Sequence, residues 1–301
     1  TRYPLVTGVQ TCALPISRAR IAPPDDTSTF EGWVTARFGA RLYELFFQTY
    51  SERLWGIPCT ELDSDFAAQR IKNFSLGAAL KSALRPSSGT GHKTLVDRFA
   101  YPRLGAGQVY DRMAAQIEAH GGEIRLRTPV AALVLEQGAV RGVITTDGRR
   151  IAARHVISTM PLTLLVRTLP DLPAPVAAAC DALRFRNTTL VFARVQRPSP
   201  FPDQWIYVHD PRVAMGRLTN FSNWSDEVGG DRAATILCAE YWSNDEDPLW
   251  SLDDADLDVI VREDLNVSGL IGETAVDRTA DRKSTRLNSS HEWISRMPSS
   301  A

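Results

Sequence analysis

The first pattern along the chain is a helical one. Between Glu31 and Trp55 the apolar residues recur at steps of three and four, which places them on one face of a helix. Pro58 ends the pattern, because it restricts Ile57 and cannot continue the hydrogen-bond ladder. A shorter helical stretch follows at residues 65–71. The sequence therefore predicts a helical region before residue 100.

The pattern changes from a helix to strands in the middle of the chain. Residues 107–122 have an apolar stripe and end in Gly121-Gly122, a glycine pair typical of a helix end. Alternating stretches then predict three strands with turns at Gln137-Gly138 and Asp147-Gly148. We expect these strands at residues 123–136, 140–146 and 150–158. Pro161 is well suited to the first position of the helix that follows.

The stretch from Arg184 to Trp242 is rich in β-forming residues. Its apolar runs are separated by clusters of Pro, Asp, Gly and Ser, which is typical of an antiparallel sheet. The predicted strands are 188–195, 205–209, 215–220 and 235–241. A last helix is expected at residues 253–265, because Asp253 and Asp254 favour a helix N-terminus.

Both ends of the chain have an unusual coding relationship. Residues 6–16 and residues 281–291 can be encoded by the two strands of one DNA string, which resembles a sequencing-library adapter. We therefore expect residues 1–17 and 281–301 to be non-native flanks, and exclude them from the fold prediction.

Composition excludes several classes of protein. The chain is 44% hydrophobic and 23% charged with a net charge of −1, and no apolar run reaches the roughly 18 residues of a transmembrane helix. Neither a nucleic-acid partner nor a membrane span is expected. Cys59, Cys180 and Cys238 are widely spaced, which favours reduced thiols in a cytoplasmic protein. The histidines are equally dispersed, so we expect no metal site. Oligomeric state is not predicted.

Four short motifs in the middle of the chain resemble a known family. They are Tyr101–Gly107 (YPRLGAG), Gly121-Gly122, Thr128-Pro129-Val130 and Val156–Pro161 (VISTMP). Their order resembles the middle of FAD-dependent amine oxidases, protoporphyrinogen oxidases and desaturases. The flanking stretches resemble bacterial NAD(P)/FAD-dependent oxidoreductases near the UDP-galactopyranose mutases, so the likeness covers residues 30–270. The sequence departs from the family in lacking an N-terminal G-x-G-x-x-G and a C-terminal Gly-Asp segment.

The resemblance implies an α+β fold with two lobes. One is an incomplete α/β FAD-binding lobe of the glutathione-reductase type, at residues 101–174 with a β-hairpin. The other is a substrate lobe with a helical part at residues 18–100 and an antiparallel sheet at residues 175–270.

The resemblance also implies which residues approach FAD. Val130 is expected beside the adenine, and Thr159, Met160 and Pro161 near the dinucleotide, although the latter also fit a plain strand-to-helix junction. Arg103, Gly105 and Gly107 have the composition for close approach to a flavin, since glycines admit backbone and a guanidinium stabilises a reduced ring. The same three residues equally fit a helix-entry turn.

The aromatic residues of the predicted sheet suit either an apolar substrate pocket or a core. They are Trp205, Tyr207, Phe221, Trp224, Tyr241 and Trp242. No residue is assigned as a catalytic base, because the flavin carries the chemistry in such enzymes.

The function implied is oxidation of a C–N or C–C bond of a small molecule by hydride transfer to flavin. One alternative is a flavin-dependent isomerase similar to UDP-galactopyranose mutase, which a cluster including Arg184, Arg186 and Arg217 would favour. The other alternative is a non-catalytic relic of the fold. Without the pyrophosphate-binding glycines, we expect this chain by itself to be inactive.

Overall fold

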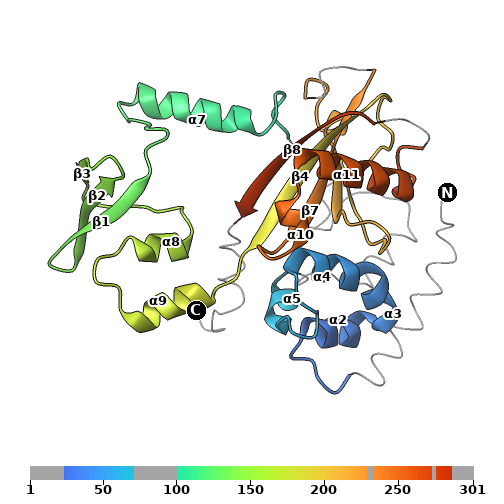
Figure 1. Ribbon diagram of the computed structural model, residues 1–301, viewed down its shortest axis with the longest axis horizontal. Helices are drawn as coiled ribbons and strands as arrows, with labels where there is room; N and C mark the ends of the chain where they lie inside the picture. The colour runs from blue at the N-terminus through green and yellow to red at the C-terminus, as the bar shows by residue number, and fades with distance from the viewer. Residues whose placement is uncertain (1–23, 71–99, 229–232, 273–275, 287–301) are drawn as a thin grey trace, which may run out of the picture. The chain divides into compact units, whose positions relative to one another are not determined.

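The structure is a computed structural model that describes residues 24–70, 100–228, 233–272 and 276–286 (Figure 1). The described residues fall into two compact units. Unit 1 comprises residues 24–105 and 186–286, and unit 2 comprises residues 106–185. The sequence placed the corresponding boundaries at residues 101 and 175. Cys59, Cys180 and Cys238 are buried free thiols.

The helical part of unit 1 does not form the single helix predicted for residues 31–55. Gly39 breaks it, because its φ of +83° lies where side chains other than glycine are strained. The chain then continues through a π-helical turn. The elements are α2 (Phe30–Phe38), α3 (Ala40–Tyr43), the π-helical turn η1 (Glu44–Gln48), α4 (Thr49–Trp55) and α5 (Ser64–Arg70).

These helices enclose a core of their own. Phe30, Val34, Phe38 and Phe66 are buried there, and Trp55 packs edge-on against Phe66 at 4.4 Å between ring centroids. Helix α2 is capped by Thr29, whose hydroxyl accepts a hydrogen bond from the backbone N–H of Gly32.

Unit 1 also contains the predicted antiparallel sheet (Figure 1). Its five strands are β4 (Arg186–Val195), β5 (Trp205–Tyr207), β6 (Arg217–Asn220), β7 (Thr235–Ser243) and β8 (Val276–Arg286). They lie in the order β5-β6-β7-β4-β8, and every neighbouring pair is antiparallel. A 3₁₀ turn, η2 (Phe221–Asn223), follows β6, and the short helix α10 (Pro248–Ser251) follows β7.

Strand alternation divides this sheet into a core face and an open face. On β4 every second residue from Asn187 to Val195 is buried, and β7 aligns Tyr241 and Leu237 with that set. Helix α11 (Asp254–Ser268) covers the core face with Leu257, Val261 and Leu265, all of them fully buried. The residues between them on each strand point to the open face.

Helix α11 begins as the sequence predicts. The Asp253 side chain accepts a hydrogen bond from the Asp256 N–H at 2.9 Å. Gly269 ends the helix in the left-handed conformation.

Strand β8 extends into the expected C-terminal flank. It pairs with β4 from Val276, opposite Val195, to Arg286, opposite Arg186. Residues 281–286 therefore continue the pairing that residues 276–280 begin. The N-terminal flank lies outside the described residues.

Unit 2 contains shorter strands than the sequence predicts. Its elements are α7 (Gly107–Ala119), β1 (Val130–Glu136), β2 (Ala139–Thr145), β3 (Arg150–Ala152), α8 (Leu162–Arg167) and α9 (Ala174–Ala182). The first strand starts at Val130 and not at residue 123, because Arg127 has a positive φ of 52° and Pro129 offers no N–H. The third strand ends at Ala152, six residues before the predicted end, and Ile157 is left 92% exposed.

Few side chains of unit 2 are buried. Those less than a tenth exposed are Val134, Thr145, Thr163 and Cys180. Helix α7 buries none, so its predicted apolar stripe of Val109, Met113 and Ile117 is exposed. The described part of unit 2 thus has helix and strand faces that pack on nothing within the unit.

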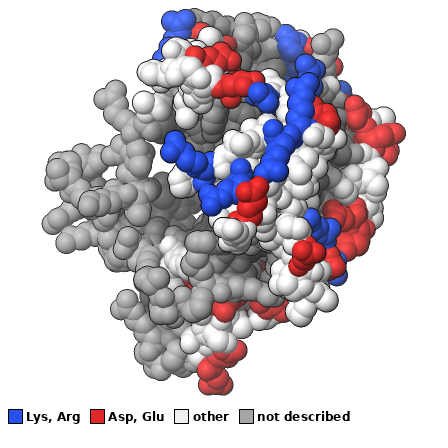
Figure 2. All heavy atoms as spheres, turned by 90° about the vertical axis from the view of Figure 1, so that its left-hand side faces the viewer, with Lys and Arg blue, Asp and Glu red and all other residues white. Residues whose placement is uncertain are grey.

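Basic and acidic side chains are interspersed on the face shown in Figure 2.

Candidate active-site surface

Two of the predicted flavin-binding residues, Arg103 and Gly105, belong to unit 1. Their segment lies against the connection between β6 and β7. The Ser225 hydroxyl donates to the Arg103 carbonyl at 2.6 Å, and the Arg103 Nε lies 3.0 Å from a Glu227 carboxylate oxygen. Gly105 has a φ of +90°, which explains a glycine at this turn. The Arg103 side chain is exposed and paired.

The other predicted cofactor residues belong to unit 2. Gly107 is the first residue of α7, and a Cβ there would meet no atom within 4 Å. Val130 begins β1 opposite Thr145 and is half-buried. The remaining three lie on the segment that enters α8, namely Thr159, Met160 and Pro161.

That entry segment has a defined local geometry. The Met160 N–H donates to the Ser158 hydroxyl at 3.3 Å, and the Pro161 carbonyl accepts from the Leu165 N–H at 2.9 Å. Pro161 is the N-cap of α8, one position earlier than predicted.

The open face of the five-stranded sheet carries a row of aromatic side chains. Trp205 and Tyr207 are two residues apart on β5 and therefore share a face. Trp205 stacks on Trp224 with ring centroids 5.5 Å apart, and Tyr207 meets Tyr50 of α4 edge-on at 4.9 Å. We call this set the aromatic row, and its members are Tyr101, Trp224, Trp205, Tyr207, Tyr50 and Trp242.

The two ends of the aromatic row are formed by contacts between distant segments. At one end lies Tyr101, which belongs to the segment that leads to Arg103. Its ring centroid is 4.8 Å from that of Trp224. At the other end Tyr50 meets Trp242 at 5.5 Å. Gly216 makes room for Trp242, because a Cβ at that position would lie 1.9 Å from the indole.

An ion pair lies beside the tyrosines of the row. Arg217 on β6 donates two hydrogen bonds to Glu240 on β7, Nε to Oε1 at 2.8 Å and Nη2 to Oε2 at 2.5 Å. Burial opposes the charge of Arg217, but the hydrogen bonds and charge of Glu240 outweigh that effect and raise the pKa of the guanidinium. The Glu240 side chain is 10% exposed and the Arg217 side chain 37%, so the carboxylate is the buried member of the pair.

His209 lies at the same end of the row. Its ring is 5.8 Å from Tyr50 and 6.3 Å from Phe46, which projects from the π-helical turn η1. Burial, together with the nearby charge of Arg53, lowers the pKa of the imidazole. Its Nδ1 is buried with no hydrogen-bond partner. π-Helical turns are frequent at functional sites, and here the turn brings Phe46 to this end of the row.

Two arginines fix α4, and with it Tyr50, to the sheet. The Arg53 guanidinium donates to the carbonyls of Val208, Asp210 and Met215 at 2.8 to 3.2 Å. Arg186 donates in the opposite direction, to carbonyls of the last turn of α4 and to Trp242 O.

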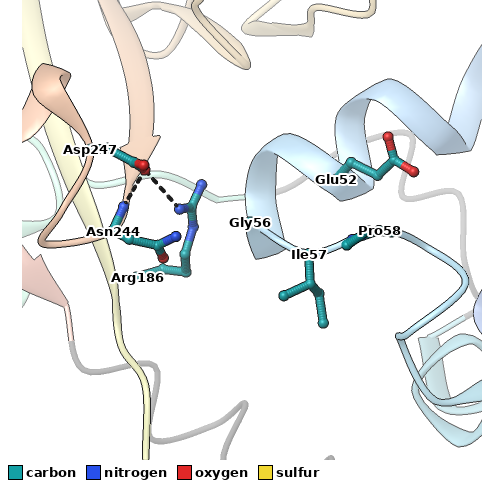
Figure 3. Close-up of a pocket in the computed structure, with 7 residues that line it drawn as sticks. All are labelled: Glu52, Gly56, Ile57, Pro58, Arg186, Asn244 and Asp247. Carbon is teal, nitrogen blue, oxygen red and sulfur yellow. Dashed lines mark hydrogen bonds and ion pairs between the residues drawn. The ribbon is translucent and has the colours of Figure 1, made fainter.

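Arg186 also lines an open cleft of about 370 Å³ at the end of α4 (Figure 3). There it pairs with Asp247, which accepts a hydrogen bond from the Asn244 N–H as well. Gly56 is required at the helix end, because a Cβ would lie 2.5 Å from the Arg186 guanidinium. The cleft is thus occupied by a helix-capping arginine whose donors are engaged, and we assign it a structural role.

The six aromatic residues noted in the sequence divide between the two faces. Tyr241 is fully buried on the core face, so for this residue the core alternative is the correct one. Trp242, one residue later, points the other way by strand alternation. Phe221 stacks on Phe192 of β4 at 6.2 Å. Tyr50 and His209 were missed, because only the docking of α4 brings Tyr50 to the sheet.

The residues present fit FAD only in part. Gly107 has open space beside it and Val130 is half-buried, so both positions are accessible to a ligand. The sequence has no G-x-G-x-x-G turn for the pyrophosphate, and Arg186 and Arg217 are engaged with α4 and with Glu240. The described residues therefore provide no cradle for the diphosphate.

The antiparallel sheet of unit 1 and the β-hairpin of unit 2 agree with the expected α+β fold. Residues 12–292 match the family model of flavin containing amine oxidoreductases, so the chain belongs to that family. This match confirms the expected family and FAD as its cofactor.

Solved structures show the same fold. A reduced UDP-galactopyranose mutase has a TM-score of 0.72 at 18% identity, over 94% of this chain and 61% of that one. A protein from Exiguobacterium sp. assigned as a protoporphyrinogen oxidase has a TM-score of 0.63 at 20% identity, over 89% and 58%. A putrescine oxidase bound to putrescine has 0.56 at 15%, over 97% and 68%. The chain thus spans about three fifths of the first two.

The described residues contain neither a membrane-spanning helix nor a candidate metal site. No helix there is long and apolar enough to cross a membrane. Nor do those residues contain a cluster of three or more His, Cys, Asp or Glu that could hold a metal ion.

Proposed function

We propose that this chain forms the substrate lobe and part of the FAD lobe of an oxidoreductase that oxidises a C–N or C–C bond of a small molecule. The observation that carries the proposal is the contact of Tyr101 with Trp224. It joins the segment that the family resemblance assigns to the flavin with the end of the aromatic row. Substrate bound along the row would then be close to the segment of Arg103 and Gly105.

FAD supplies the chemistry when it is bound, by accepting the hydride. The side chains of the chain itself bind and orient the substrate and exclude water. The aromatic row supplies the contact surface, and α4 is held in place by Arg53 and Arg186. No carboxylate or histidine is assigned as a catalytic base. Val130, Thr159, Met160, Pro161 and Gly107 remain the proposed FAD contacts of unit 2.

The alternative of a mutase-like isomerase is less well supported by the arginines. A nucleotide diphosphate requires cationic donors that are free to bind it. Arg186 is engaged with the end of α4, and Arg217 is engaged with Glu240. We therefore favour an oxidoreductase.

The experiment that tests the proposed function is recovery of the intact coding sequence from the source DNA. The intact enzyme should purify with bound FAD, and a suitable substrate should bleach the flavin absorbance in the absence of oxygen. An intact enzyme that binds FAD and converts a nucleotide sugar without net reduction would establish the isomerase. An intact chain that binds no FAD would identify a relic of the fold.

A further inference from the structure

The aromatic row is continuous and accessible. Successive ring centroids lie 4.8 to 5.5 Å apart in the contacts Tyr101–Trp224, Trp224–Trp205, Tyr207–Tyr50 and Tyr50–Trp242. Strand β5 joins the two halves, because Trp205 and Tyr207 are neighbours on one face. They are 39% and 47% exposed, respectively. Binding of an apolar molecule over rings this exposed is favourable, because it removes apolar surface from water.

Three ion pairs lie along the open face or at the end of the row in the part of the chain that the structure describes. Arg217 is bound by Glu240 and Arg194 by Asp277, and Arg103 pairs with Glu227 at the end of the row. A diamine would compete with Arg217 for Glu240, and a diphosphate would compete with Glu240 for Arg217. A diphosphate would leave the Glu240 carboxylate, whose side chain is 10% exposed, without its partner, which is costly. A diamine would leave the 37% exposed Arg217 with only water in place of Glu240.

The polar atoms of the row are also accounted for in part. The Trp224 indole N–H donates to the Gln204 carbonyl at 3.2 Å, so it needs no acceptor from a ligand. What Trp224 offers a ligand is therefore the flat face of its indole ring.

We propose that the substrate is an elongated, uncharged and largely apolar molecule that lies along the aromatic row. This inference rests on the proposed function, and it assigns the substrate class. The length of the row favours an extended molecule, and its paired charges disfavour both a cationic amine and an anionic nucleotide. Trp205 and Tyr207, at the centre of the row, are the residues that determine specificity.

The test uses the full 301-residue chain and diphenylhexatriene, an elongated uncharged fluorophore. The variant carrying Trp205→Thr and Tyr207→Thr keeps residues that favour strands but removes both central rings. Because two ring contacts are lost, we expect binding to weaken by about tenfold or more. Tyr110→Thr is the matched control, because it removes a 71% exposed ring from α7, outside the aromatic row. The probe fluorescence that the double variant loses should be retained in this control.

A second variant and two competitors complete the test. Tyr207→Lys places an unpaired charge in the row without altering strand pairing. It should reduce probe binding as the double Thr variant does. Putrescine and UDP should not displace the probe. Equal probe binding by the parent and both row variants, or displacement by either charged competitor, would overturn the proposal. Bleaching of the intact enzyme's flavin by a charged amine would also overturn it, while leaving the proposed oxidoreductase function intact.

Discussion

Arg186 donates a hydrogen bond of 2.6 Å from Nη2 to the backbone carbonyl of Arg53. The two arginines thus form a reciprocal attachment. Arg53 reaches from α4 to carbonyls around the connection between β5 and β6, and Arg186 reaches from β4 back to α4. Tyr50 depends on this attachment, since it is carried to the aromatic row by the same helix.

Replacement of Arg186 by Ala should be strongly destabilising. It removes the donors to the carbonyls of Arg53, Leu54 and Trp242, where the arginine side chain is only 10% exposed. We expect a loss of about 2–4 kcal/mol in the free energy of unfolding, measured by urea titration. Arg167→Ala removes an exposed ion pair and should cost less than about 1 kcal/mol. Equal losses in the two variants would show that Arg186 is not a structural clamp.

His209 should make stability depend on pH. Its folded-state pKa is lower than the ordinary 6.5, so the unfolded chain binds more protons as the pH falls below that value. The stabilisation is present above pH 6.5 and is lost as the pH falls through the folded pKa. Denaturant titrations should therefore show that the free energy of unfolding falls as the pH falls across this range. His209→Phe should reduce this dependence on pH. His155→Phe, at an exposed histidine, should retain it.

The chain as it stands should not retain FAD. The sequence has no glycine turn for the pyrophosphate, and Arg186 and Arg217 are engaged in unit 1. Purified protein should lack the flavin absorbance band, and added FAD should be lost on gel filtration. A preparation that is yellow at one flavin per chain would contradict this expectation.

Val130→Asp in the recovered intact enzyme should weaken FAD binding by more than about tenfold, since burying an unpaired carboxylate costs at least several kcal/mol. Gln137→Asp, at an exposed turn position with a φ of 51°, serves as the control and should bind FAD like the parent. Titration of both apo-proteins, followed by flavin fluorescence, measures the difference. Unchanged binding by a folded Val130→Asp protein would remove Val130 from the site.

Truncation tests how much β8 contributes. The sequence predicts that residues from 281 onward are dispensable, yet residues 281–286 pair with Arg186–Val191 of β4. We expect a chain that ends at Ala280 to melt a few degrees lower than one that ends at Arg286, because half of the β4 edge loses its partner. Identical melting temperatures would support the dispensable flank.

The sequence predicted four of the five strands of the sheet, because alternation is a local signal, but it did not predict β8. Strands β4 and β7 and the start of α11 lie where the pattern placed them. Gly39 was overlooked, because one glycine barely disturbs an apolar stripe although its φ of +83° breaks the helix. The strand predicted to end at Ser158 fails for another reason. Its apolar residues need a neighbouring strand, which the described part of unit 2 does not supply.

The candidate site was harder to predict than the fold. The aromatic residues were noted, but only the register of β7 separates Trp242 on the open face from Tyr241 in the core. Tyr50 joins Tyr207 across more than 150 residues of sequence, and Arg186 joins Arg53 across 133. Such contacts have no periodicity along the chain, so a single sequence cannot indicate them.

Strand β8 pairs with β4 through the main chain along the whole outer edge. The ladder continues without interruption from residues 276–280 into residues 281–286, the start of the expected flank. Main-chain donors and acceptors are the same in every residue except proline, so this edge acts as a template for whatever extended chain is tethered beside it. The length of the sheet at this edge is therefore set by how far the chain continues in an extended form, and not by a particular side-chain sequence.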